Sequence, residues 1–138
     1  LAAAGLERLG QKERITQYLE PKVCLPAPRQ GALAVEGRTG DQKLKKLVAK
    51  INDPVSVITV TAEHAFLDCI EGGCKVPVGA YAQLKADKLE IEGIVGRVDG
   101  SQVLREKISG PQEEADKLGI ELAEKLIAQG ARDILDNV

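Results

Sequence analysis

The hydrophobic positions repeat with two different periods along the chain, and these periods separate helical from extended segments. Between residues 41 and 51, apolar positions recur at i, i+3, i+4 and i+7, with four lysines between them. This spacing predicts an amphipathic helix with one solvated face.

A second helix is predicted over 55–70, because an Asn-Asp-Pro start suits a helix N-terminus. Its β-branched run VSVITVT favours a strand by propensity, but the start and the apolar spacing favour the helix. The apolar side of that helix is predicted to carry Ile58, Ala62, Ala65, Phe66 and Cys69.

After Gly72 and Gly73 the period changes to two. Apolar residues alternate along 76–84 and again along 89–95, which is typical of strands with one buried face. The sequence KADK separates these strands as a turn. The sequence VDGS contains an Asp-Gly hairpin signal and precedes a third predicted strand, QVLREKI. Three strands joined by short turns predict an antiparallel meander.

Helices are predicted at both ends of the chain. Residues 1–9 are strong helix formers followed by Gly10, which suits a helix C-terminus, and residues 13–19 are predicted to form another short helical turn. The last helix is predicted to begin at Ser109 or Gly110, with Pro111 in its first turn. It is predicted to end at Gly130, before a short tail. Its expected sheet-facing residues are Ala115, Leu118, Leu122 and Leu126.

The segment 23–38 has a different character. Pro26 and Pro28 exclude a helix and a central strand at their own positions, and the composition of 26–31 favours a linker. The apolar run ALAV, 32–35, predicts a short buried strand. From residue 52 onward the order of elements predicts an α+β domain, in which helices pack on one face of a three-stranded antiparallel sheet. The other face is left to water or a partner.

Composition excludes several functional classes. The 138 residues carry a net charge of −2 without a basic stripe, which argues against nucleic-acid binding, and no apolar run reaches the length of a membrane helix. Three irregularly spaced cysteines do not predict a disulfide framework, so a reducing, cytoplasmic setting is expected. One histidine and no C-x-x-C motif argue against zinc. The uncapped first helix and the absence of methionine predict that the sequence is cut from a longer polypeptide.

Cys74 is the main candidate for chemistry. It lies in IEGGCKVPVG, 70–79, where two glycines allow a bulky group to approach the backbone and Lys75 favours a thiolate. The residues alone leave an ordinary loop cysteine as the alternative. A cysteine protease would need a histidine base. The only candidate, His64, lies well before the cysteine on the preceding predicted helix, which argues against a protease. Cys24 and Cys69 are predicted to be small buried hydrophobic residues.

The segment IEGGCKVPVGAYA, 70–82, resembles the cofactor-attachment segment of the porphobilinogen deaminase (hydroxymethylbilane synthase) family. LAAAGLERLG, LPAPRQGALAVEGR, TAEHAFL, GSQVLRE and LAEKLIAQGARDIL resemble further segments of the family, in the same order. The resemblance covers essentially the whole chain and matches the C-terminal part of a three-domain enzyme. It implies the end of domain two at 1–24, a return segment to domain one with a linker helix at 25–51, and a C-terminal cofactor-carrying α+β domain at 52–138.

Members of that family condense four porphobilinogen molecules to hydroxymethylbilane, releasing ammonia, on a dipyrromethane primer bound by a thioether. The resemblance implies that Cys74 is the covalent anchor and that Gly5, Arg8, Gln30 and Gly31 contact the cofactor or the growing chain, whose acidic groups favour arginine. The catalytic acidic residue is expected upstream, in N-terminal domains, so this sequence alone is expected to be inactive. A cytoplasmic monomer is expected, with porphobilinogen and pyrrole-chain intermediates as partners and without metal, nucleic acid or membrane.

Two positions depart from the family pattern. The family usually has GQGA where this chain has Arg29-Gln30-Gly31-Ala32, and AERAF where it has Ala62-Glu63-His64-Ala65-Phe66. Arg29 adds a cation that contacts either an acidic group or solvent, and pairing at His64 would depend on pH. The alternatives to the enzyme are a stand-alone α+β module that binds a small molecule or a protein, and a structural remnant that keeps the fold without the primer.

Overall fold

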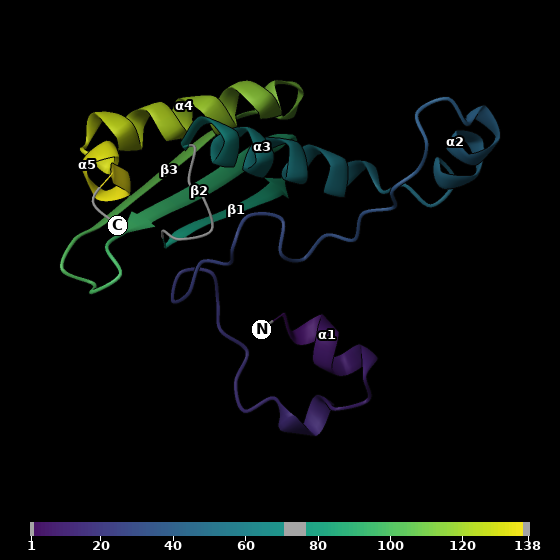
Figure 1. Ribbon diagram of the computed structural model, residues 1–138, viewed down its shortest axis with the longest axis horizontal. Helices are drawn as coiled ribbons and strands as arrows, with labels where there is room; N and C mark the ends of the chain where they lie inside the picture. Colours follow the sequence, from purple (N-terminus) through teal and green to yellow (C-terminus); the bar gives the residue numbers. More distant parts are fainter. Residues whose placement is uncertain (1, 71–76, 137–138) are drawn as a thin grey trace.

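The computed structural model describes residues 2–70 and 77–136. Within them, a three-stranded antiparallel sheet in the order β1-β2-β3 carries α3 and α4 across one face (Figure 1). This arrangement confirms the predicted α+β class. The strands are β1 (Val78–Lys85), β2 (Lys88–Gly96) and β3 (Val103–Pro111). The helices are α1 (Ala3–Arg8), α2 (Gln42–Val48), α3 (Pro54–Ile70), α4 (Ala115–Ala128) and α5 (Ala131–Asp136), with the 3-10 turns η1 (Lys12–Arg14) and η2 (Gln112–Glu114).

The predicted two-residue alternation sets the strand register. Ala82 of β1 lies opposite Ile91 of β2, which lies opposite Ile108 of β3. All three side chains are buried on the face that the helices cover. The helices cover this face with Phe66 of α3 and with the predicted sheet-facing residues of α4. All of them are buried: Phe66, Ala115, Leu118, Leu122 and Leu126.

Two glycines allow the layers to approach closely. A Cβ at Gly93 of β2 would lie 2.8 Å from Cζ of Phe66, so the missing side chain leaves room for that ring on the sheet. A Cβ at Gly119 of α4 would clash with the carbonyl oxygen of Ala62 on α3. The helix pair therefore depends on a bare backbone at this crossing, because close-packed interiors do not absorb an added carbon without a shift.

The helix predicted over 55–70 is confirmed as α3, despite its β-branched residues. Asp53 caps its start, because its Oδ2 accepts hydrogen bonds from Ser56 N (2.8 Å) and Ser56 Oγ (2.6 Å). Pro54 then occupies the first helical position, where its missing N–H costs nothing. Packing of the apolar side of α3 on the sheet outweighs the modest helix propensity of valine and threonine.

The predicted start of the last helix is wrong. Ser109, Gly110 and Pro111 belong to β3, where they lie opposite Glu90, Leu89 and Lys88 of β2. The free edge of the long strand β2 offers partners to these residues, so strand pairing prevails over local helix-start signals. The helix α4 begins only after η2. Gly130 ends it at φ 104°, as predicted, but the expected tail is the helix α5, which buries Ala131 and Ile134 completely.

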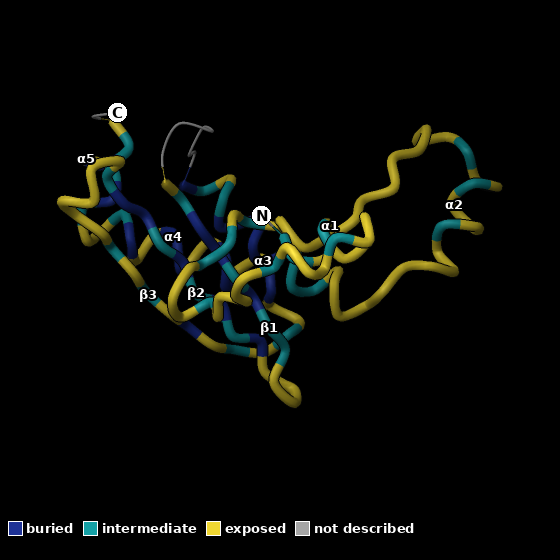
Figure 2. Tube along the Cα trace, turned by 90° about the horizontal axis from the view of Figure 1, so that it is seen from below, coloured by how far each residue is buried: buried dark blue, intermediate teal, exposed yellow. Residues whose placement is uncertain are grey.

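Residues 2–52 contain little buried surface (Figure 2). Figures 1 and 2 both show α2 at the end of an extended loop, away from the sheet. The strand predicted at 32–35 is wrong: Leu33 and Val35 are 78% and 60% exposed, and no strand pairs with them in the part of the chain that the structure describes. The turn predicted at 13–19 shortens to η1, because residues 15–20 are extended or irregular.

None of the helices in the described residues is long and apolar enough to cross a membrane.

Candidate functional site

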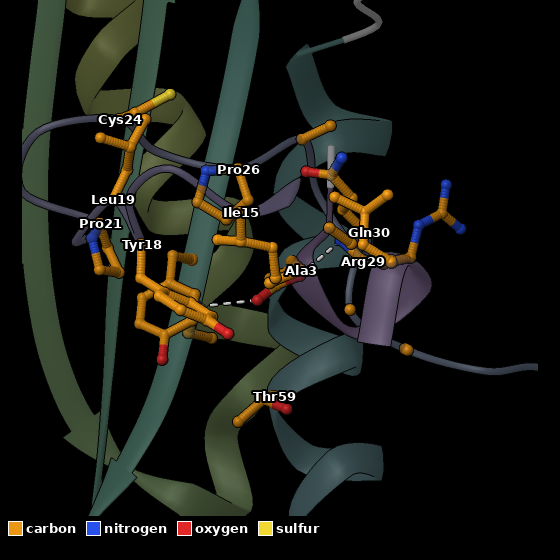
Figure 3. Close-up of a pocket in the computed structure, with 18 of the residues that line it drawn as sticks. Ala3, Ile15, Tyr18, Leu19, Pro21, Cys24, Pro26, Arg29, Gln30 and Thr59 are labelled. Carbon is orange, nitrogen blue, oxygen red and sulfur yellow. Dashed lines mark hydrogen bonds between the residues drawn. The ribbon is translucent and has the colours of Figure 1, made fainter. Parts of the chain in front are cut away.

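A cavity of about 870 Å³ lies between the N-terminal segment and the β1–α3 side of the sheet domain (Figure 3). One part of its wall comes from α1 and residues 14–19, another from residues 24–32, and the rest from α3 and β1. Figure 3 shows side chains from these segments around the cavity, among them Tyr18, Cys24, Gln30 and Thr59. The wall therefore combines segments that are far apart in the sequence.

Glu63 joins three of these segments. This residue of α3 is only 7% exposed. Its Oε1 accepts a hydrogen bond from Ala82 N of β1 at 2.8 Å, and its Oε2 accepts one from Arg29 N at 2.6 Å. Burial raises the pKa of the Glu63 carboxyl above its usual value, because the two N–H donors and the Arg29 charge only partly offset the loss of water.

The segment 26–31 lies along the outer edge of β1. Ala80 N of that strand donates to Pro26 O at 3.1 Å, so the segment covers backbone groups that an edge strand otherwise exposes. Gln30 N donates to Ala27 O at 3.1 Å, which closes a turn. Arg29 in this turn has φ 65°, in the left-handed region. The predicted linker is thus fastened to the sheet domain.

The structure brings together only some of the predicted site residues. Gln30 and Gly31 both line the cavity and are exposed there. Gly5 and Arg8 lie on α1, exposed, and are not among the residues that line it, although their neighbours Ala3 and Leu6 are. The roles of all four residues stay predictions.

Cys74 lies outside the described residues, in the segment between α3 and β1. Cys24 is exposed in the cavity wall, which corrects the prediction of a buried residue. It follows an irregular segment without a helix or strand that could bury it. Cys69 packs, partly buried, against the core as predicted.

Among the polar residues of the wall that the sequence analysis did not identify as site residues are Arg14, Tyr18 and Glu63. Glu63 carried a usable signal, because it lies beside Ala62 and near Phe66 on the apolar side of a predicted helix, where an acidic residue requires hydrogen-bond partners. Tyr18 carried none: its Oη donates to Glu7 Oε1 at 2.7 Å, a contact that raises the pKa of the Tyr18 phenol and depends on the local chain path.

The charges of the wall suit an acidic ligand. Arg14 and Arg29 contribute two cations, and arginine pairs well with carboxylates. The carboxylate of Glu63, which also lines the cavity, already accepts hydrogen bonds from two backbone donors. Among the described residues, no group of three or more histidine, cysteine, aspartate or glutamate side chains could hold a metal ion.

Comparison with known proteins gives two family models along the chain. Residues 1–46 match "Porphobilinogen deaminase, dipyromethane cofactor binding domain", and residues 57–128 match "Porphobilinogen deaminase, C-terminal domain". A porphobilinogen deaminase of Oceanobacillus iheyensis is 48% identical over 139 residues, covering 100% of this chain and 44% of the relative. One of Geobacter metallireducens is 47% identical over 138 residues, covering 100% of this chain and 43% of the relative. The chain thus spans less than half the length of these relatives.

Proposed function

Because the chain belongs to the porphobilinogen deaminase family, we propose that it supplies the cofactor-attachment part of a porphobilinogen deaminase. The complete enzyme would condense four porphobilinogen molecules to hydroxymethylbilane and release ammonia. The observation that carries the proposal is the match of two successive family models, together with relatives that are 48% and 47% identical over the whole chain. The acidic catalytic group and the remaining binding groups would come from the N-terminal domains of a longer polypeptide.

Cys74 is the proposed anchor of the cofactor. It is the cysteine of the segment IEGGCKVPVG. Its thiolate would attack the methylene carbon of a porphobilinogen-derived unit, so that the C–S bond of a thioether forms as the C–N bond breaks, and the amine would leave as ammonia with the thiol proton. Lys75 next to it favours the thiolate, the reactive form of the side chain. When bound, the dipyrromethane supplies the pyrrole end to which new units are added. A reducing, cytoplasmic setting agrees with this requirement for an available thiol, and a monomer is proposed.

The cavity fits such a group in size and charge. Its volume of about 870 Å³ lies in the usual range of ligand sites. Arg14 and Arg29 can pair with the acetate and propionate groups of pyrroles, and the amide of Gln30 can donate or accept a hydrogen bond. Arg8 and Gly5 on α1 are proposed to contact the pyrrole chain once the rest of the protein is present.

The test is the mass of the intact full-length protein, purified in active form. We expect an adduct of one dipyrromethane, mapped to the peptide that contains Cys74, and colour with an acidic aldehyde reagent for pyrroles. In Cys74→Ala the adduct and turnover are lost, whereas Cys69→Ala, a matched cysteine replacement, keeps the adduct. An active protein with an unmodified Cys74 would overturn the proposed anchor. A full-length protein with neither adduct nor turnover would favour a binding module without catalysis.

A further inference from the structure

We propose that Glu63 is a positioning residue that fixes the segment 26–31 on the edge of β1 and so holds Gln30 and Gly31 in the wall of the cavity. The inference rests on the proposed function, in which Gln30 and Gly31 contact the pyrrole chain. Glu63 acts through the backbone of that segment rather than by touching the ligand.

The first support is the pair of hydrogen bonds that Glu63 accepts. One joins its Oε1 to Ala82 N at 2.8 Å, and the other joins its Oε2 to Arg29 N at 2.6 Å. A single side chain on α3 therefore links the edge of the sheet to a residue 34 positions earlier in the chain. The neighbouring bond from Ala80 N to Pro26 O, 3.1 Å, anchors the other end of the same segment.

The second support is the backbone conformation of Arg29. Its φ of 65° places a side chain with a Cβ in the left-handed region, which costs about 1 kcal/mol or more relative to the ordinary regions. Such a conformation persists when surrounding contacts hold it. The bond from Arg29 N to Glu63 is the contact that reaches this amide, and the next two residues are Gln30 and Gly31.

The third support is the chemistry of the carboxylate. Both groups that donate hydrogen bonds to Glu63 are backbone N–H groups, and an ionised carboxylate offers two acceptor oxygens. An amide at this position offers one acceptor and turns an N–H₂ group toward the second donor. Because Glu63 is 7% exposed, water has little room to replace the lost acceptor. Glu63→Gln is therefore expected to release one attachment without removing side-chain volume.

The experiment begins with hydrogen exchange on the 138-residue chain itself. In Glu63→Gln, exchange at Arg29 N and through residues 30–32 is expected to accelerate at least about tenfold, while the strands β2 and β3 keep their protection. Glu63→Asp keeps the negative charge but shortens the side chain, so the same local acceleration of exchange is expected. This variant replaces Glu63→Gln in the experiment if Glu63→Gln does not fold. Glu124→Gln, the same chemical change at an exposed position of α4, is the matched control. Unchanged exchange at Arg29 in both Glu63 variants would overturn the proposal.

The second readout is turnover by the full-length enzyme with porphobilinogen. Glu63→Gln is expected to raise KM about tenfold and to change kcat less, because the loss concerns positioning of binding groups. In a double-mutant cycle with Gln30→Ala, the two effects on KM are expected to be strongly non-additive, since Glu63 acts through Gln30. Additive effects, or an unchanged KM beside accelerated exchange, would overturn the positioning role and leave the proposed function intact. Absence of deaminase activity in the unmutated full-length protein would overturn the proposed function but not the exchange result.

Discussion

The guanidinium of Arg29 lies against the imidazole of His64, with Nη1 3.2 Å from Nδ1. These are the two positions at which we expect the chain to depart from the family pattern, and the fold brings them together although they are 35 positions apart. Nδ1 of His64 also lies 3.4 Å from Asp68 Oδ1. Nδ1 must accept to bind Arg29 and must carry a proton to bind Asp68, so the two contacts compete for one nitrogen.

The conformation of Arg29 gives a stability prediction. Arg29→Gly and Arg29→Ala both remove the contact with His64, but only glycine adopts φ 65° without a Cβ penalty. The free energy of unfolding of Arg29→Gly should therefore exceed that of Arg29→Ala by about 1 kcal/mol. Denaturant titration of the two variants measures the difference. Equal stability, or a more stable alanine variant, would show that the left-handed conformation is not retained.

The pKa of Glu63 gives a prediction for pH. Burial raises this pKa above the usual value of 4.5 in the folded protein, so between the two values the folded state binds more protons than the unfolded chain. The contribution of Glu63 to the free energy of unfolding is therefore fully present below 4.5 and decreases as pH rises through the raised value.

Denaturant titrations of the unmutated protein and of Glu63→Gln, over a series of pH values, test this sign. The stability of the unmutated protein relative to Glu63→Gln should decline with rising pH just above 4.5. Glu124→Gln, at an exposed position, serves as a control. A relative stability that rises with pH in this interval would mean that the two backbone hydrogen bonds outweigh burial.

The crossing of α3 and α4 gives a third prediction. Gly119→Ala should lower the free energy of unfolding by about 3 kcal/mol, because its Cβ would clash with the carbonyl oxygen of Ala62 and lie 2.8 Å from the Cβ of Ala65. The control is Gly5→Ala on α1, where no atom lies within 4 Å of an added Cβ; this change should be neutral or slightly stabilising. A Gly119→Ala protein as stable as the control would contradict the close helix crossing.

The sequence predicts those parts of the fold that local chemistry and periodicity determine. The sequence Asn-Asp-Pro predicts a helix start, which the structure places at Asp53. The apolar side of α3 and the alternation in β1 and β2 are predictable from spacing. The start of α4 is not, because the pairing of Gly110 with Leu89 of β2 prevails over the helix signals at 109–111. The close packing at Gly93 and Gly119 is likewise not predictable from the sequence, because it depends on which residues lie opposite them in the fold.

The candidate site was only partly readable for the same reason. Gln30 and Gly31 were identified by resemblance to a family, and the structure places both in one wall of the cavity. Glu63 has a role only when the segment around Arg29 returns to the edge of β1. An acidic residue on the apolar side of a helix predicts a hydrogen-bond partner. Which backbone N–H group is that partner depends on the tertiary structure.

The most direct measurement is the mass of the full-length protein in its active form, followed by mapping of the modified peptide. We expect one dipyrromethane on the sulfur of Cys74, present in the Cys69→Ala protein and missing, together with turnover, in the Cys74→Ala protein. Turnover by a protein whose Cys74 carries no adduct would contradict this expectation.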